Sequence, residues 1–473
     1  MSEMLTTDIC VIGGGSGGLS VAAGAVQMGA RVVLVEKAAM GGDCLNTGCV
    51  PSKALLAAAE RAHAVRSSAP FGIRGVEPQV DWQAVYRHVH GVIAAIAPND
   101  SVERFEGLGV KVIQAAGEFV DERTLRAGDT QIRAKYFVIA SGSSPFVPPI
   151  PGLDEVGYFT NENIFANTSP IEHLIVVGGG PIGMEMAQAH RRLGAQVSVI
   201  EVARLLPRDD AELAAVVLQR LSEEGIDLYE GATSLRFERA KQGVVALFES
   251  DSASRRIVGT HVLIATGRRA NAGSLNLQAA GVQYKPQGIT VDARLRTSNK
   301  RIFAIGDVAG PYQFTHMAAY QAGIVVRNML FRWPAKVDYS AVPWVTYTDP
   351  ELAHVGMTRS DAEKAGKDVQ VLRWSFEEND RAQAERRTEG LVKVVTDKSG
   401  RILGASIVGL HAGELIQPWV LAISQKLKIG AMTGMIAPYP TLAEVNKRIA
   451  GSFFTPALFS ERVRKIVRLL LRL

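Results

Sequence analysis

Two of the three cysteines in this 473-residue sequence, Cys44 and Cys49, lie in one glycine-rich stretch and are separated by four residues. Cysteine pairs at short spacing bind metals, form disulfides or remain as unreactive thiols. A zinc site needs further cysteine or histidine ligands at short spacing, and none lies near the stretch from Gly41 to Lys53. The pair therefore indicates either a redox-active disulfide or two thiols without chemical function.

A disulfide between these cysteines requires an irregular backbone between them. Residues five apart in a regular α-helix are separated by about 7.5 Å along the axis, whereas the Cα atoms of a disulfide usually lie within roughly 6.8 Å. Gly48 permits unusual backbone angles and Asn46 tolerates the left-handed region, so we expect the turn to depend on them. The helix-forming run 52–60 follows Pro51 and places Cys49 near the positive end of a helix, which favours a thiolate.

The composition is that of a globular protein with two to four domains, since 47% of the residues are hydrophobic and 21% are charged. The 52 basic and 47 acidic side chains give a net charge of +5, too balanced for a nucleic-acid-binding protein. No apolar run reaches the roughly 18 residues of a membrane span, and no secretory signal begins the sequence, so we expect a cytoplasmic location. A disulfide in that reducing compartment would be catalytic, and Cys10 lies in an apolar strand pattern that predicts a core residue.

The elements expected to position this chemistry begin with a strand–helix–strand unit near the N-terminus. Gly13, Gly15 and Gly18 form a G-x-G-x-x-G turn between the first strand and the helix, and Glu36 closes the second strand. The glycines allow the backbone to approach a pyrophosphate, the helix N-terminus favours an anion, and Glu36 can accept hydrogen bonds from ribose hydroxyls. The predicted ranges are 8–12 and 31–35 for the strands and 19–29 for the helix.

The same unit recurs later in the chain. Gly178, Gly180 and Gly183 form the second turn, and Glu201 follows Gly178 by 23 residues, as Glu36 follows Gly13. Two dinucleotides are therefore expected, each with its own domain. The predicted strands are 174–177 and 196–200, with a helix ending near residue 193.

Further segments predict how these units are completed. Similar strands at 136–142 and 261–267 end in small residues, which suits a backbone beside a cofactor. A proline-rich linker at 145–152 marks a domain boundary. Asp307, at the end of a buried strand, is either a solvated strand end or a hydrogen-bond partner for a cofactor sugar or ribityl chain. Strands at 342–347, 369–376, 391–396 and 402–408, with helices at 414–428 and 441–450, predict a C-terminal α+β domain.

Together these motifs resemble those of the class I pyridine nucleotide-disulfide oxidoreductases, in the branch of dihydrolipoamide dehydrogenase and mercuric reductase. The resemblance covers residues 8–450 and depends on the 41–53 stretch, both glycine turns, and the segments 265–267 and 305–307. It implies an α/β fold with two Rossmann-like domains, for FAD and NAD, and a C-terminal α+β dimerisation domain that makes a homodimer. The expected division is 1–150 with 271–340 for FAD, 151–270 for NAD(P), 341–459 for the interface, and 460–473 as a basic tail.

The resemblance also assigns residue roles. Cys49 is similar to the charge-transfer thiol beside the flavin and Cys44 to the interchange thiol that faces the substrate, while Lys53 and Glu185 resemble an ion pair beside the flavin. No metal ligands are expected. The expected FAD-binding residues are Gly13, Gly15, Gly18, Glu36, Lys53, Gly117, Ser141, Gly142 and Asp307, and the expected NAD-binding residues are Gly178, Gly180, Gly183, Glu201 and Gly267.

The choice of nicotinamide follows from Glu201. Its carboxylate would accept a hydrogen bond from the 2′-hydroxyl of NADH and repel the 2′-phosphate of NADPH. Arg204 nearby could favour the phosphate. NADH is therefore the expected cofactor, and NADP(H) is less favoured.

One departure from the family concerns the acid-base residue. Disulfide reductases of this family carry a His-Pro-Thr-x-x-Glu stretch, where this chain has Tyr439 and Glu444 at the first and last positions. A phenol with a reference pKa of about 10 is a poor base near neutrality, so Glu444 acts alone or the substrate supplies its own thiolate. Mercuric reductases also have tyrosine there, but they carry a C-terminal cysteine pair that this sequence lacks. The leading hypothesis is an NADH-dependent disulfide or dithiol oxidoreductase, and the alternative is a mercuric or cupric reductase.

The C-terminal segment 460–473 is the second departure. Val463, Ile466, Val467 and Leu470 share one helical face, and four arginines and one lysine are among the remaining residues. Such a helix either lies on an anionic membrane surface or packs against the protein with its arginines in solvent. The first possibility would make the protein a membrane-surface electron donor, peripheral at the inner membrane face.

Overall fold

The computed structural model describes residues 3–332 and 334–473 and divides them into two compact units. The first contains the chain up to Gly178 together with Ala189–Val202 and Gly231–Val337. The second contains Gly179–Gln188, Ala203–Glu230 and Asp338–Leu473. The boundary passes through the second glycine-rich turn, so the four-part division expected from the sequence remains a prediction.

The main sheet of the first unit follows directly from the N-terminal strand–helix–strand pattern. Its strands run in the order β3-β2-β1-β6-β5-β4, and β18 pairs with β6. The pairs among β1, β2, β3, β6 and β18 are parallel, whereas β4, β5 and β6 pair in antiparallel fashion. The strands are β1 Glu3–Ile12, β2 Val32–Glu36, β3 Lys111–Gln114, β4 Gly117–Asp121, β5 Thr124–Ala127, β6 Thr130–Ile139 and β18 Ile302–Ala304.

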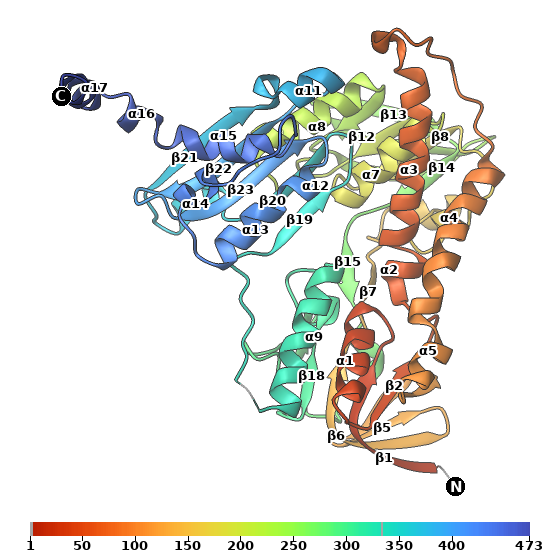
Figure 1. Ribbon diagram of the computed structural model, residues 1–473. Helices are drawn as coiled ribbons and strands as arrows, with labels where there is room; N and C mark the ends of the chain where they lie inside the picture. The colour runs from red at the N-terminus through yellow and green to blue at the C-terminus, as the bar shows by residue number, and fades with distance from the viewer. Residues whose placement is uncertain (1–2, 333) are drawn as a thin grey trace. The chain divides into compact units, whose positions relative to one another are not determined.

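Two helices far apart in the chain, α1 and α9, pack together beside this sheet (Figure 1). Ile9 and Val11 of β1 are fully buried in the same cluster as Val21 of α1 and Val325 of α9. Parallel strands need cover on both faces, and a second cluster with Cys10 and Phe137 forms on the other side. The helices of this unit are α1 Ser16–Gln27, α2 Gly42–Asn46, α3 Cys49–Arg66, α4 Trp82–Ile96, α5 Val102–Gly107, α6 Leu153–Val156 and α9 Thr315–Leu330.

The second strand–helix–strand unit is also present. Strand β8 pairs in parallel with β9 and with β14, and helix α7 begins at Pro181 and crosses the boundary between the units. A short antiparallel ribbon joins β7 to β15 in the first unit. The bounds are β7 Ser143–Pro145, β8 His173–Val177, α7 Pro181–Arg192, β9 Gln196–Ile200, β11 Thr233–Arg239, β12 Val244–Ser250, β13 Ala253–Gly259, β14 His261–Ile264, β15 Arg268–Ala270, β16 Tyr284–Lys285 and β17 Gly288–Ile289.

The second unit is built on an antiparallel sheet in the order β19-β20-β23-β22-β21. One face packs on α12 to α15 around the fully buried Trp419, whose indole N–H donates to Asn446 Oδ1 (2.7 Å). The predicted helix at 414–428 is instead broken into α12 and α13, and the one predicted from 441 begins at Glu444. The bounds are α8 Ala211–Glu223, β10 Ile226–Tyr229, β19 Pro343–Thr346, β20 Glu351–Gly356, α10 Arg359–Lys364, β21 Val369–Ser375, α11 Asp380–Glu385, β22 Leu391–Asp397, β23 Ile402–Gly409, α12 Ala412–Leu415, α13 Gln417–Ser424, α14 Ile429–Thr433 and α15 Glu444–Ser452.

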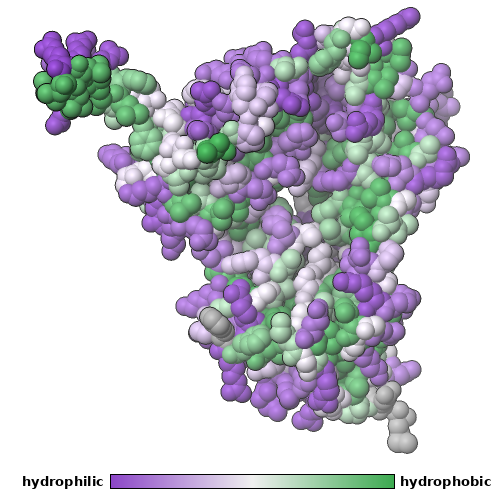
Figure 2. Space-filling model, in the orientation of Figure 1, coloured by the Kyte–Doolittle hydropathy of each residue, from purple (hydrophilic) through white to green (hydrophobic). Residues whose placement is uncertain are grey.

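The C-terminal segment forms α16 Thr455–Leu458 and α17 Glu461–Leu470, and neither helix has a buried residue. Figure 2 shows hydrophobic residues grouped on one side of this segment and hydrophilic residues on the other. Ser460 caps α17 by accepting a hydrogen bond from the backbone N–H of Val463 (3.4 Å). Among the residues that the structure describes, no helix is long and apolar enough to cross a membrane.

Candidate redox and dinucleotide sites

The loop that carries the two cysteines is irregular, as its spacing requires. Helix α2 contains Cys44, the chain turns at Thr47 and Gly48, and α3 begins at Cys49. The left-handed residues are Gly41 (φ 86°) and Gly42 (φ 61°), which precede the pair. Gly48, with φ −125° and ψ −113°, adopts unusual backbone angles as expected, whereas Asn46 lies within α2 and does not use the left-handed region.

Asn46 and Gly48 support the loop in other ways. The amide of Asn46 donates to the carbonyl oxygens of Met40 (3.0 Å) and Gly42 (2.8 Å) and thereby closes the turn. A Cβ atom on Gly48 would lie 2.9 Å from both the backbone oxygen and Oδ2 of Asp43, closer than real Cβ contacts. Glycine is therefore needed at position 48 for space.

The cysteine loop is attached to the first glycine-rich turn. The backbone N–H of Gly41 donates to the carbonyl oxygen of Gly14 (2.9 Å), and Gly15 and Gly41 form an isolated parallel bridge. A Cβ on Gly42 would lie 2.8 Å from Cα of Gly15. The turn expected to hold FAD and the loop expected to exchange electrons are thus in direct backbone contact.

The two thiols form an unsymmetrical pair. Both are free, and their side chains are hydrogen-bonded to each other. The hydrogen bond from Cys44 lowers the pKa of Cys49 to about 6, with help from Thr315 (Sγ to Oγ1 3.6 Å) and the positive charge of Lys53. The same hydrogen bond, followed by burial, raises the pKa of Cys44. Cys49 is therefore the thiolate of the pair near neutral pH.

The first glycine turn fits a pyrophosphate-bearing cofactor such as FAD. A Cβ on Gly13 would lie 2.3 Å from the carbonyl oxygen of Ala140, and one on Gly18 would lie 1.9 Å from that of Gly13. Only glycine allows this approach of the turn, the helix and the neighbouring strand. Glu36 is 8% exposed and accepts from the backbone N–H groups of Gly14 (2.5 Å) and Ala38 (2.7 Å), so its carboxylate also holds the turn.

The remaining candidates for FAD lie on the segments that follow β6 and β18. Asp307 is largely buried, which raises the pKa of its carboxyl, and Oδ2 accepts a hydrogen bond from Ser143 Oγ (2.5 Å). Ser141 Oγ donates to the carbonyl oxygen of Asn271 (2.7 Å). Gly142 has a φ of 69°, and a Cβ there would meet nothing within 4 Å, so space remains beside it. Gly117 instead opens β4, where a Cβ would lie 3.2 Å from the side chain of Leu125.

The second glycine turn repeats the crowding of the first. A Cβ on Gly178 would lie 2.4 Å from the carbonyl oxygen of Ala265, as one on Gly13 meets Ala140. Gly180 and Gly267 have nothing within 4 Å of a built Cβ, and Gly183 is buried in α7. Glu201 directly follows β9 and is partly buried. Gly180 and Gly183 belong to the second unit and the other three residues to the first, so the second dinucleotide site remains a prediction.

The expected Lys53–Glu185 pair remains a prediction, because the two residues belong to different units. Lys53 lies in α3, one turn after Cys49, and its ammonium donates to Ser52 Oγ (3.5 Å). Glu185 is 4% exposed in α7 and accepts from the backbone N–H of Tyr347 (3.0 Å).

Tyr439 and Glu444 lie in the second unit. Tyr439 is 69% exposed, and its hydroxyl donates to Asp380 Oδ2 (2.7 Å). That hydrogen bond raises the pKa of the phenol, so Tyr439 is still less often deprotonated near neutral pH than its residue type suggests. Glu444 opens α15 and pairs with Arg448 (2.8 Å).

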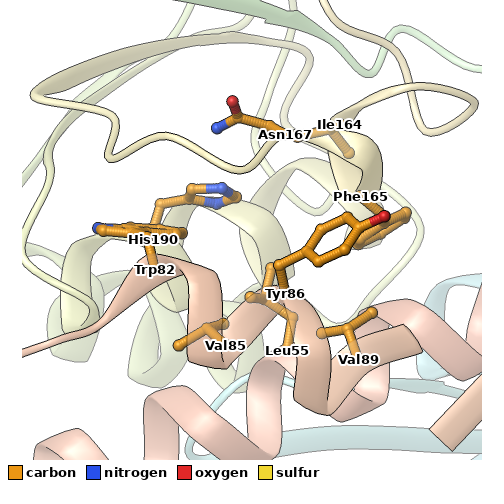
Figure 3. Close-up of a pocket in the computed structure, with 9 residues that line it drawn as sticks. All are labelled: Leu55, Trp82, Val85, Tyr86, Val89, Ile164, Phe165, Asn167 and His190. Atoms are coloured by element: carbon orange, nitrogen blue, oxygen red, sulfur yellow. The ribbon is translucent and has the colours of Figure 1, made fainter. Parts of the chain in front are cut away.

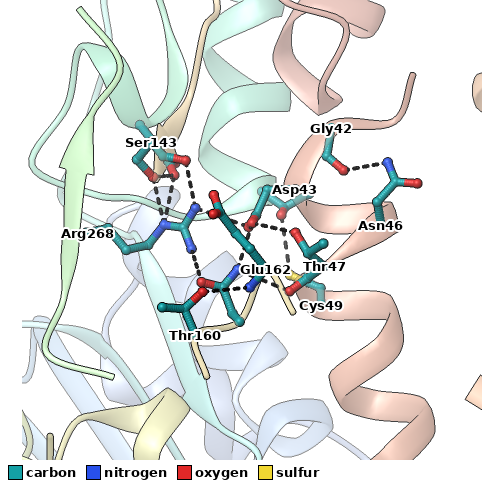
Figure 4. Close-up of polar contacts among 12 residues, drawn as sticks. Gly42, Asp43, Asn46, Thr47, Cys49, Ser143, Thr160, Glu162 and Arg268 are labelled. Atoms are coloured by element: carbon teal, nitrogen blue, oxygen red, sulfur yellow. Dashed lines mark hydrogen bonds and ion pairs between the residues drawn. The ribbon is translucent and has the colours of Figure 1, made fainter. Parts of the chain in front are cut away.

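The sequence reasoning missed the residues that surround the cysteine loop. Arg268, directly after Gly267, contacts Asp43, Ser143 and Asn161. Figure 4 shows the side chains of Arg268, Asp43 and Ser143 converging beside the loop. Thr315, the first residue of α9, also contacts Cys49. Position in the sequence was the one signal that could have indicated these residues. Asp43 directly precedes Cys44, and Arg268 follows a predicted strand end.

A small cavity between α4 and the segment around Ile164 is separate from this network (Figure 3). Trp82, Tyr86 and the buried His190 line it, and the rings of Trp82 and His190 are stacked with centroids 5.9 Å apart. Its volume of about 20 Å³ accommodates roughly one water molecule. We therefore assign it to core packing.

Comparison with known proteins identifies two family models in the chain. Residues 7–322 match the pyridine nucleotide-disulphide oxidoreductase model, and residues 342–450 match the dimerisation domain of the same family. A mercuric reductase from Bacillus cereus is 36% identical over 440 residues, which is 92% of this chain and 70% of that protein. A dihydrolipoyl dehydrogenase from Thermus scotoductus is 34% identical over 453 residues, 93% of this chain and 96% of that protein.

Solved structures show the same fold. The Cu(II) complex of the HOCl-induced flavoprotein disulfide reductase RclA from Escherichia coli matches with a TM-score of 0.84 and 27% identity, covering 94% of this chain and 99% of that one. LpdA from Mycobacterium tuberculosis matches with a TM-score of 0.86 and 26% identity, again covering 94% and 99%.

Proposed function

Because the chain belongs to the pyridine nucleotide-disulphide oxidoreductase family, we propose that Cys44 and Cys49 are its redox pair and that NADH reduces them through FAD. The observation that carries this proposal is the hydrogen-bonded thiol pair at the start of α3, in which the pKa of Cys49 is lowered and that of Cys44 is raised. The proposed electron acceptor is a disulfide other than glutathione disulfide, and in the reverse direction the corresponding dithiol would be the electron donor.

The residues have separate roles in the proposed reaction. FAD, when bound by the first glycine turn and Asp307, would pass two electrons between the nicotinamide and the cysteine pair. The helix N-terminus of α3 and Lys53 hold Cys49 as a thiolate, while Cys44 keeps its proton until it attacks. Attack of Cys44 on a substrate disulfide releases one substrate thiol, and Cys49 then displaces the second as the Cys44–Cys49 disulfide forms.

NADH is the proposed electron donor. Glu201, placed at the end of β9, carries the charge that disfavours a 2′-phosphate. Arg204 supports this choice, because its guanidinium donates to the carbonyl oxygens of Pro207 (3.2 Å) and Asp209 (3.1 Å) within its own loop. An arginine held by its own loop is poorly placed to bind a 2′-phosphate.

The proposed active form is a homodimer, in line with the matched dimerisation domain. In that assembly Tyr439 and Glu444 of one subunit would face the cysteines of the other. The raised pKa of Tyr439 makes it a hydrogen-bond donor rather than a base. Glu444 would then accept the proton, and this substitution for the family histidine argues against glutathione disulfide as the substrate.

A metal-ion reductase is the second candidate. It is favoured by Tyr439, by mercuric reductases among the relatives, and by a structural neighbour described as a Cu(II) complex. In this reaction Hg(II) or Cu(II) would be the substrate, bound by the thiolate of Cys49 and by Cys44. Among the described residues no group of three or more histidine, cysteine or acidic side chains is placed to hold a metal ion, so the cysteine pair would have to receive it directly.

The exposed helix α17 supports a further proposal about location, that the tail binds an anionic membrane surface. Its apolar residues Ile466, Val467 and Leu470 are between 45% and 60% exposed. Its charged residues are mainly basic. These are Arg462, Arg464, Lys465 and Arg468, with Arg472 beyond the helix and Glu461 as the single acid.

The Cys44→Ala variant tests the disulfide mechanism. NADH should still reduce the flavin, measured by loss of its visible absorbance without oxygen, while turnover with lipoamide falls to background because no interchange thiol remains. A panel of lipoamide, glutathione disulfide, Hg(II), Cu(II) and quinones, with NADH and NADPH in parallel, identifies the acceptor. Undiminished disulfide turnover in the variant would refute the role of Cys44, and Hg(II) or Cu(II) as the fastest acceptor would favour the second candidate.

A further inference from the structure

The loop between the two thiols needs support from outside itself. Helix α2 has five residues, far fewer than an isolated helix needs for stability in water, and the chain changes direction at Thr47 and Gly48. A disulfide between Cys44 and Cys49 nevertheless requires a narrow range of Cα separations. Some contact must therefore hold the loop in the geometry that allows the bond to form.

Asp43 supplies contacts along the whole loop. Its Oδ1 accepts hydrogen bonds from Thr47 Oγ1 (3.0 Å) and from the amide of Asn161 (2.9 Å). The same Asn161 amide donates to the carbonyl oxygen of Thr47 (3.1 Å). Oδ2 of Asp43 pairs with Arg268 Nη2 at 3.3 Å. The residue beside Cys44 is thus linked to the turn that leads to Cys49.

Arg268 provides a rigid anchor for these contacts. Its side chain is only 12% exposed, and Nε donates to Ser143 Oγ (2.7 Å) while Nη2 donates to the Ser143 carbonyl (2.8 Å). Arg268 begins β15, which pairs with β7, so its backbone is fixed as well. The guanidinium also lies 3.8 Å from Asp307 Oδ2. Figure 4 shows it between Ser143 and the cysteine loop.

We propose that Asp43, Arg268 and Asn161 are positioning residues that keep Cys44 and Cys49 in the geometry required for disulfide formation. This inference rests on the proposed redox role of the pair. In exchange with glutathione, two glutathione thiols reduce the Cys44–Cys49 disulfide to two thiols and form one glutathione disulfide, so two electrons and two protons are transferred. Loss of the support favours the open dithiol over the closed disulfide.

The test measures the dithiol-to-disulfide ratio of the FAD-loaded, full-length protein at fixed ratios of reduced to oxidised glutathione, by trapping free thiols. Asp43→Asn keeps the shape of the side chain but removes its charge. We expect it to raise the dithiol-to-disulfide ratio about three- to fivefold, since the pair is partly exposed. Arg268→Met should act in the same direction. The dithiol-to-disulfide ratio of the double variant should differ from wild type by no more than that of Arg268→Met alone, because both substitutions break the same Asp43–Arg268 ion pair.

Matched controls separate positioning from general effects of charge or folding. Arg269→Met and Glu60→Gln remove exposed charges from the next residue of β15 and from α3, and both should keep the wild-type ratio. If Arg268→Met does not fold or does not retain FAD, Asn161→Ala is the second test, because it removes the amide that joins Asp43 to Thr47. It should shift the ratio in the same direction.

The outcomes distinguish two failures. A wild-type ratio in both Asp43→Asn and Asn161→Ala would overturn the positioning role, as would independent, multiplying effects of Asp43→Asn and Arg268→Met. A wild-type protein that forms no Cys44–Cys49 disulfide at any glutathione ratio would overturn the proposed redox role itself.

Discussion

At the scale of single residues, the proposed chemistry depends on a difference between the pKa values of two thiols of the same type. Cys49 occupies the first turn of α3 and receives a hydrogen bond from Cys44, contacts Thr315 and lies near Lys53. Each of these features stabilises negative charge on Cys49. Cys44 lies beside the Cys49 thiolate and is partly buried, so ionisation of Cys44 is disfavoured.

This difference predicts the pH dependence of alkylation in the reduced protein. A pKa of about 6 means that Cys49 is mainly neutral below pH 6 and mainly thiolate above it. The rate of its reaction with iodoacetamide, followed by mass spectrometry of the labelled peptide, should therefore rise through pH 6 and level off by pH 8. Cys44, with its raised pKa, should react more slowly throughout this range.

Cys10 is the internal control, because it is fully buried and its pKa is raised by that burial. It should remain unlabelled while the protein is folded. Equal alkylation rates for Cys44 and Cys49, or a faster rate for Cys44, would contradict the assignment of Cys49 as the thiolate.

At the scale of elements, the glycine turns bring helix, strand and cysteine loop into backbone contact. Gly18 of α1 lies against the carbonyl of Gly13, and Gly42 of the cysteine loop lies against Gly15. The first contact shapes the turn proposed to bind FAD, and the second places the cysteine loop beside that turn. Side chains at these positions would separate the elements.

A pair of alanine substitutions in α1 tests this role. Gly18→Ala would place a Cβ 1.9 Å from the Gly13 carbonyl oxygen, so we expect FAD to be lost, measured as the flavin absorbance that co-purifies with the protein. Gly24→Ala, six residues further along the same helix, meets only Val326 Cγ2 at 3.8 Å. It should retain FAD and stabilise the protein by about 0.4–1 kcal/mol, because alanine favours the helix. FAD retained at the wild-type level in Gly18→Ala would show that the close approach is not required.

At the scale of the whole molecule, the chain consists of two compact units and an exposed C-terminal tail. The second unit has its own core around Trp419, and its residues 342–450 match a dimerisation domain. The tail adds nothing to that core, since α16 and α17 bury no residue. Its apolar face and basic residues are therefore available to a surface outside the chain.

Sedimentation with vesicles tests whether that surface is a membrane. The full chain should sediment with vesicles that contain phosphatidylglycerol and not with pure phosphatidylcholine, and a chain ending at Ser460 should bind neither. Replacing Arg464 and Lys465 by Gln should weaken binding by about 2 kcal/mol, roughly thirtyfold, because each basic residue near an anionic surface contributes about 1 kcal/mol. The same replacement of Lys364 and Lys367, which are exposed elsewhere in this unit, is the control. Equal sedimentation of full and shortened chains would exclude the tail as a membrane anchor.

Local sequence patterns were sufficient to predict many of the helices and strands and the family of this protein. The two glycine turns, the acids that follow them and the helix after Pro51 each depend on residues close in the chain, so periodicity and turn chemistry indicate them directly. The family assignment followed from these motifs and was confirmed by the comparisons. In the cysteine loop Gly48 has the unusual backbone angles expected of it. The left-handed region, which Asn46 tolerates, is used instead by Gly41 and Gly42.

Tertiary structure alone decided what supports the cysteine pair. Asp43, Asn161 and Arg268 lie on three segments far apart in the chain, and no local pattern relates them. Folding brings them together because β7 and β15 pair and place Arg268 opposite the cysteine loop. The sequence by itself determined which two thiols lie close enough along the chain to be the proposed redox pair, because their spacing and the glycine-rich stretch around them are local features. The fold determined the geometry and charge around them, because hydrogen bonds and ion pairs depend on distances that chain order does not specify.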